Sequence, residues 1–191
     1  MATSARRLEL LGSAVSYALA GAGMILPAQL PCRTPCPGWD LDMLLDHLGD
    51  SIGVLTEAIT GAATGYREPD PDPVARLRGQ AGELLDACTA AGPSGRRTAV
   101  RGRELTENMV AVIAAVEIAV HGWDISVACG TCQPVPPGLA AVLLPIAPLL
   151  ITPGTRPGLF ADPVQLPGPA CPGDQLVAFL GRQPRPNQAS G

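Results

Sequence analysis

The two histidines of this chain and one glutamate are the residues best suited to hold a metal ion. His47 and His121 are the only histidines, and Glu117 precedes His121 by four residues. Residues i and i+4 share one face of a helix, so Glu117 and His121 are expected to point the same way. Two imidazoles and a carboxylate leave a coordination position open for water or substrate, which is typical of catalytic zinc and of non-haem iron. The spacing alone does not choose the metal.

Glu117 lies in an apolar run, residues 111–121, that contains no other acidic or basic residue before its final histidine. Burying a carboxylate without a partner is costly, so a divalent cation or a neutral imidazole must satisfy it. Two interpretations stay open. One is a metal site formed by His47, Glu117 and His121, and the other is a hydrogen-bonded Glu117–His121 pair with His47 unrelated on the surface.

Four further charged residues are candidates for supporting roles. Asp46 and Asp124 flank the histidines in sequence, and either could orient an imidazole or simply face solvent. Asp50 follows His47 by nearly one helical turn and is a candidate general base. Arg182 is a candidate for binding an anionic substrate, with an exposed surface position as the alternative.

The two tryptophans are candidates for lining a binding pocket. Aromatic residues make up only 3% of the chain, and Trp39 and Trp123 lie close in sequence to the histidines. Tryptophans in such positions also anchor helix ends. Both roles remain open for each residue.

Six cysteines raise the question of redox or structural metal chemistry. Residues 129–132 form a CxxC motif, and Cys32 and Cys36 could supply a second pair for structural zinc. A core of this size needs no disulfide, so free thiols are expected, with Cys36 packed in the core.

The hydrophobic periodicity predicts an all-α fold, a four-helix bundle with short helical or irregular decoration at its C-terminus. The residues from Arg96 to Arg103 are expected to cross the surface. A single domain is expected over residues 1–182, followed by a loose tail over 183–191. The main helices are predicted at residues 4–25, 40–59, 74–91 and 105–129, and short ones at 138–150 and 174–180.

Composition and charge exclude several classes of protein. The formal net charge is −4 without a basic stripe, which argues against nucleic-acid binding. No segment is expected to span a membrane, and the mildly apolar N-terminus is interpreted as an amphipathic helix rather than an export signal. These features predict a cytoplasmic protein, a monomer or homodimer, that acts on a small-molecule substrate.

Several motifs resemble the DinB/YfiT-like superfamily. Within it the chain is most similar to an actinobacterial metal-binding branch related to the N-terminal domain of mycothiol-dependent maleylpyruvate isomerase. The likeness spans nearly the whole chain. It is carried by TPCPGW at residues 34–39, LLDHL at 44–48, EIAVHGWD at 117–124, RPGLF at 156–160 and DQLVAFLGR at 174–182.

The resemblance implies a DinB-like four-helix bundle with a metal triad at His47, Glu117 and His121. It also implies a metal-dependent enzyme that uses mycothiol or a related thiol, as a transferase or an isomerase-like protein. Zinc is the expected metal, with nickel or iron as alternatives, and mycothiol is the expected cosubstrate. No second domain follows here, so maleylpyruvate isomerisation itself is not expected. A thiol-independent lyase, cyclase or hydrolase of specialised metabolism, and a non-catalytic metal-binding or redox-sensing module, remain alternatives.

Overall fold

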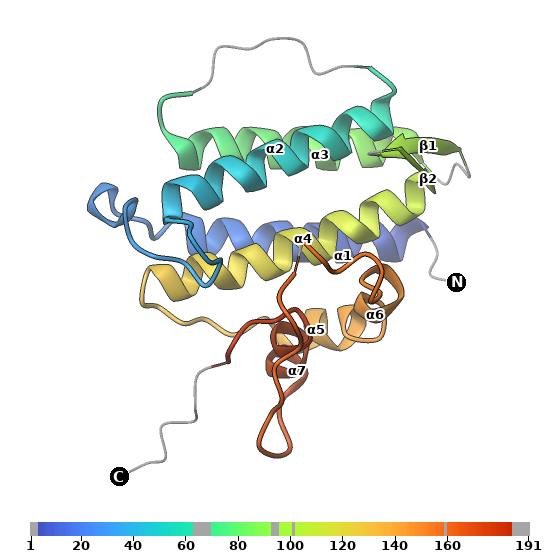
Figure 1. Ribbon diagram of the computed structural model, residues 1–191. Helices are drawn as coiled ribbons and strands as arrows, with labels where there is room; N and C mark the ends of the chain where they lie inside the picture. Colours follow the sequence, from blue (N-terminus) through green and yellow to red (C-terminus); the bar gives the residue numbers. More distant parts are fainter. Residues whose placement is uncertain (1–3, 63–69, 93–95, 101, 159, 185–191) are drawn as a thin grey trace. The chain divides into compact units, whose positions relative to one another are not determined.

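The computed structural model describes residues 4–62, 70–92, 96–100, 102–158 and 160–184 (Figure 1). Its internal contacts divide the chain into two compact units, Met1–Gln133 and Pro134–Gly191, which are described separately. The single domain expected over residues 1–182 stays a prediction. Of the expected loose tail, residues 185–191 lie outside the described residues.

Four long helices build the first unit, which confirms the predicted all-α class. They are α1 (Ser4–Ala22), α2 (Leu41–Thr60), α3 (Pro73–Ala91) and α4 (Glu107–Ala128). The helix α1 packs along α4, while α2 packs against both α3 and α4. In Figure 1, α2 and α3 run in one direction and α1 and α4 run in the opposite direction. The first half of α2 therefore lies beside the second half of α4.

Local signals set the ends of α2 as the sequence predicts. The side chain of Asp40 caps the helix by accepting a hydrogen bond from the backbone N–H of Met43 at 2.9 Å. Gly61 ends the helix with a positive φ of 72°, a conformation that glycine adopts without steric cost. A short 3-10 helix, η1 (Pro27–Gln29), lies in the connection before α2.

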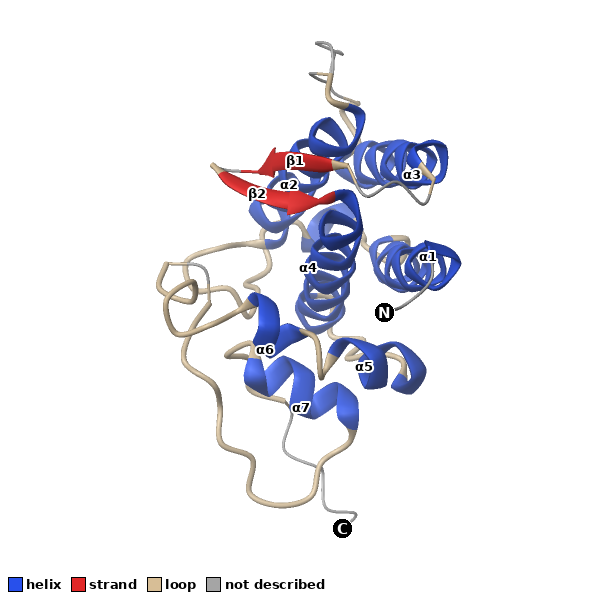
Figure 2. Cartoon of the chain, turned by 90° about the vertical axis from the view of Figure 1, so that its right-hand side faces the viewer, coloured by secondary structure: helices blue, strands red, loops and turns tan. Residues whose placement is uncertain are grey.

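The stretch after α3 that was expected to cross the surface forms a β-hairpin. The strands β1 (Arg97–Val100) and β2 (Arg103–Thr106) pair antiparallel, with Arg97 opposite Thr106. Figure 2 shows the two strands beside α2 and leading directly into α4. The Arg96 side chain fixes the base of the hairpin by donating to Glu107 Oε1 and to the Ile59 carbonyl.

Nearly every side of α4 is buried, because the helix is the centre of the first unit. By its length and its apolar composition this helix could cross a membrane. The expectation that no segment is long and apolar enough for a membrane span was therefore wrong. In the structure 78% of its most apolar stretch is buried inside the protein. The apolar run that surrounds Glu117 is therefore accounted for by packing within the bundle.

The second unit contains α5 (Pro137–Leu143), α6 (Ala147–Leu150) and α7 (Pro172–Phe179). The expected helix over residues 138–150 is interrupted at 144–146, where Pro145 lacks the N–H that a continuous helix needs. The helices α5 and α7 pack together around apolar side chains. These buried side chains include Leu139, Leu143, Leu176 and Val177.

Candidate metal centre

His47, Glu117 and His121 converge between α2 and α4. The Oε1 atom of Glu117 lies 3.3 Å from Nε2 of His47 and 3.5 Å from Nε2 of His121. The ligand atoms of the three residues all lie within 4.8 Å of one another. The structure therefore brings together the three residues that the sequence singled out, including His47, which is 70 positions from Glu117 in sequence.

The spacing of these atoms suits a shared cation better than direct hydrogen bonds. An N–H···O bond has its usual length at about 2.9 Å, and both separations are longer. Two ligand atoms bound tetrahedrally to zinc at about 2.1 Å lie roughly 3.4 Å apart. Nitrogen and carboxylate oxygen are also the donor types that zinc and non-haem iron accept. The residues present thus fit a divalent metal.

The electrostatics of Glu117 favour its charged form. Burial by itself would raise the pKa of this carboxyl, but its polar and charge interactions with the His121 and His47 imidazoles lower it well below its ordinary range. Burial by itself would lower the pKa of His121, yet its hydrogen bond with Asp124 and the polar groups of Cys36 and Glu117 nearby raise it well above 6.5. A cation bound by these residues would replace an imidazole proton, so binding and proton release are coupled.

Asp124 orients the His121 ring from the side opposite Glu117. Its Oδ2 lies 2.9 Å from Nδ1 of His121, an ordinary hydrogen-bond length, and the carboxylate is fully buried. This contact assigns the proton to Nδ1 and leaves Nε2 free to act as a ligand. Of the two flanking aspartates, Asp124 therefore takes the orienting role, while the exposed Asp46 pairs with Arg76.

The site is closed around His121 and partly open around Glu117 and His47. The side chain of His121 is 6% exposed, whereas those of Glu117 and His47 are 22% and 31% exposed. The ring of Trp39 lies against that of His47, with centroids 4.6 Å apart. Trp39, one of the two tryptophans expected at the pocket, therefore borders the site through His47. The other, Trp123, is buried in the core on α4.

Two candidate catalytic residues are not brought to the triad by any described contact. Asp50 is exposed on α2, and Ser51 instead reaches Glu117, with Oγ 3.5 Å from Oε1. Arg182 belongs to the second unit, where it is buried. The alternative of an exposed surface position was therefore wrong. Its guanidinium donates to the Leu180 carbonyl at 2.9 Å and lies over the Phe160 ring. Catalytic roles for Asp50 and Arg182 stay predictions.

All six cysteines are free thiols, as expected. Among the described residues, neither cluster that could hold a metal contains Cys32 or the CxxC pair at 129–132, so a four-cysteine zinc site finds no support. Cys36 is not simply a packed core residue. It is half-buried, and its Sγ donates to Asp124 Oδ2 at 3.4 Å. Its place in the TPCPGW motif was the signal that could have revealed this contact.

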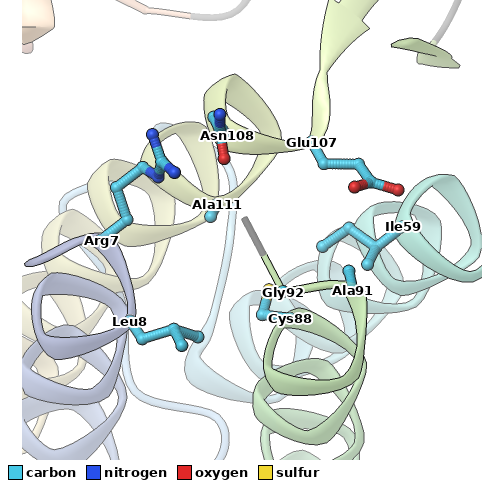
Figure 3. A pocket seen from close by; sticks show the side chains of 9 residues that line it. All are labelled: Arg7, Leu8, Ile59, Cys88, Ala91, Gly92, Glu107, Asn108 and Ala111. Carbon is cyan, nitrogen blue, oxygen red and sulfur yellow. The ribbon is translucent and has the colours of Figure 1, made fainter. Parts of the chain in front are cut away.

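A small pocket lies at the other end of the bundle, where α1 and α4 begin and α2 and α3 end (Figure 3). Arg7, Glu107 and Cys88 contribute to its wall, and the Glu107 carboxylate is paired with Arg96. None of the triad residues lines this pocket. This pocket is therefore separate from the candidate metal centre.

Comparison with known proteins finds a family that matches most of the first unit and curated relatives that match most of the chain. Residues 13–126 match the family described as "Mycothiol maleylpyruvate isomerase N-terminal domain", and this segment contains the triad, Cys36 and Asp124. Two curated relatives are uncharacterized proteins of Mycobacterium tuberculosis, from strains CDC 1551 / Oshkosh and ATCC 25618 / H37Rv. Each is 30% identical over 162 residues, which cover 82% of this chain and 87% of the relative. No solved structure matches.

Proposed function

The chain belongs to the mycothiol maleylpyruvate isomerase N-terminal domain family, and from this premise we propose that it is a metal-dependent enzyme that acts on a small molecule with a thiol such as mycothiol as cosubstrate. Its reaction class would be transfer of the thiol sulfur or an isomerisation that the thiol assists. The observation that carries the proposal is the convergence of His47, Glu117 and His121 with one side open to solvent.

The chain's own side chains divide the work at this centre. His47 Nε2, Glu117 Oε1 and His121 Nε2 would hold the metal, while Asp124 keeps the proton of His121 on Nδ1. A bound zinc ion would supply a Lewis acid that lowers the pKa of a thiol or polarises a substrate carbonyl. Trp39, against the His47 ring, would line the approach of the organic part of the substrate.

The redox-sensing alternative is less well supported than metal-dependent catalysis. A sensor thiol needs a lowered pKa, because the thiolate is the species that reacts with oxidants. Burial, followed by the charge of Cys32, raises the pKa of Cys129. The Cys129 thiol is therefore less reactive than an ordinary cysteine.

The proposal is tested first by the metal content of purified protein. We expect about one divalent ion per chain in wild type and its loss in His121→Ala. Asp86→Ala, which removes an exposed carboxylate on α3, is the matched control and should retain the metal. Equal metal content in all three proteins would overturn the site.

The thiol is tested with the metal-loaded protein and a panel of small electrophiles. Consumption of mycothiol that requires the triad supports a thiol-dependent enzyme. Turnover of a substrate without any thiol would replace this proposal with the lyase, cyclase or hydrolase alternative. Zinc, nickel and iron are compared by reloading stripped protein with each.

A further inference from the structure

Cys36 lies in a connection whose backbone is held tightly in place before α2. The Thr34 N–H donates to the Trp39 carbonyl at 3.1 Å, and the Trp39 N–H donates to the Cys36 carbonyl at 3.1 Å. The Cys36 N–H itself donates to Thr34 Oγ1 at 3.2 Å. Pro35 and Pro37 flank the cysteine and restrict its backbone further. The position of the Cys36 side chain is thus set by the local fold.

The thiol reaches across 88 positions in sequence to a buried carboxylate. Its Sγ lies 3.4 Å from Oδ2 of Asp124, within the range of a hydrogen bond that involves sulfur. The same Oδ2 accepts the Nδ1 proton of His121 at 2.9 Å. One carboxylate oxygen therefore links the connection before α2 to a metal ligand on α4.

Direct coordination by Cys36 is disfavoured by the same distances. Cys36, His121 and Asp124 do form a cluster whose ligand atoms lie within 4.8 Å of one another. However, the 2.9 Å between Asp124 Oδ2 and His121 Nδ1 is shorter than the roughly 3.4 Å expected between two ligands on one zinc ion. A shared proton accounts for that pair without a second metal.

We propose that Cys36 is a positioning residue of the metal centre. Its thiol fixes the Asp124 carboxylate, and Asp124 in turn fixes the ring orientation and the Nδ1 proton of His121, so that Nε2 points to the metal. This inference rests on the proposed metal site. The contacts then run from Cys36 to Asp124 to His121. Cys36 lies in the connection before α2, whereas Asp124 and His121 both lie on α4.

The test compares Cys36→Ala and Cys36→Ser with Cys32→Ala, which removes a half-buried thiol from the same connection. Zinc affinity is measured by competition with a chelator. Loss of a residue behind a metal ligand commonly weakens binding 10- to 100-fold, and we expect about tenfold for Cys36→Ala. Serine keeps a donor and should restore most of the affinity, and Cys32→Ala should match wild type.

A second readout does not require metal. Because the chain has only two histidines, the ring N–H signals of ¹⁵N-labelled protein are readily assigned. In Cys36→Ala the Nδ1–H signal of His121 should shift and exchange faster with water, while Cys36→Ser should resemble wild type. If Cys36→Ala does not fold, Cys36→Val, which fills a similar volume without a donor, takes its place in both measurements.

The outcomes separate this inference from the proposed function. If wild type binds zinc and the variant without a donor binds equally well, with an unchanged His121 signal, the positioning role is wrong and the metal site stands. If wild type binds no metal, the proposed function fails, and the His121 signal alone decides whether Cys36 positions the ring. A serine variant as defective as alanine would also overturn the role of the donor.

Discussion

Asp124 accepts a hydrogen bond from Nδ1 of His121 at 2.9 Å, and its carboxylate is completely shielded from solvent. The negative charge makes the imidazole a stronger ligand at Nε2, and the geometry holds the ring in one orientation. At the proposed metal centre this carboxylate would hold the His121 ligand in place.

Replacing Asp124 with asparagine should therefore weaken metal binding while leaving the triad intact. Asparagine has nearly the same shape and can still accept one hydrogen bond, but it lacks the charge. We expect zinc affinity to fall about 10- to 100-fold, measured by chelator competition. Asp46→Asn is the control, since Asp46 precedes His47 but is exposed and pairs with Arg76. Equal affinities in the two variants would contradict the orienting role of Asp124.

Metal binding should also stabilise the fold, because the triad joins α2 to α4. A ligand present at 100 times its dissociation constant stabilises the native state by about 2.7 kcal/mol. Wild type should therefore melt at a higher temperature with zinc than after chelation, and Glu117→Gln should lose this difference. Glu104→Gln, which alters an exposed carboxylate in β2, should retain it. A zinc-dependent shift of the same size in Glu117→Gln would show that the stabilising ion binds elsewhere.

Part of this site could be predicted from the sequence because the information is local. Glu117 and His121 share a helix face by their spacing, and the apolar run around Glu117 indicates a buried carboxylate that needs a partner. The periodic leucines of residues 41–59 likewise predict α2. The convergence of His47 with the other two is a tertiary contact, which the residue pattern left as one of two interpretations and which the family resemblance favoured.

The features that the sequence did not reveal depend on packing between distant segments. The thiol of Cys36 meets Asp124 across 88 positions, and no periodicity encodes that contact. Arg182 can be buried because its guanidinium donates a hydrogen bond to the Leu180 carbonyl and lies over the Phe160 ring. The composition could not indicate these contacts. The hairpin at 97–106 was missed because two four-residue strands carry little hydrophobic pattern.

Gly122 should not tolerate a larger residue, because α1 and α4 approach closely beside His121, the proposed metal ligand. A Cβ at this position would lie 2.9 Å from Ala18 Cα and 3.1 Å from Tyr17 Cδ1. Overpacking of this kind costs about 1–3 kcal/mol, so Gly122→Ala should lower the free energy of unfolding in urea.

Gly12→Ala in α1 is the matched control, since its Cβ meets no atom within 4 Å. Alanine there should stabilise the helix by about 0.5–1 kcal/mol. A Gly122→Ala variant as stable as Gly12→Ala would show that the helices can separate without cost.

Cys88 should be the slowest cysteine to react with a thiol reagent. Its side chain is buried, and burial together with the nearby Glu107 charge raises the pKa of its thiol from 9.0 to about 11. Cys171 is exposed and should react first. With a chromogenic disulfide at pH 8, Cys171→Ser should remove the fastest phase and Cys88→Ala the slowest. A slowest phase that survives in Cys88→Ala would place the least reactive thiol elsewhere.

The same shift predicts how stability depends on alkaline pH. The pKa of the Cys88 thiol is higher in the folded chain than in the unfolded one, so its full contribution to stability is present below pH 9. This contribution is lost as the pH rises toward 11, because in that range the unfolded chain releases the thiol proton and the folded chain keeps it. A shift of this size corresponds to about 2–3 kcal/mol. The free energy of unfolding should therefore fall more steeply between pH 9 and 11 in wild type than in Cys88→Ala. Parallel curves for the two proteins would mean that the Cys88 thiol ionises as readily in the folded chain as in the unfolded one.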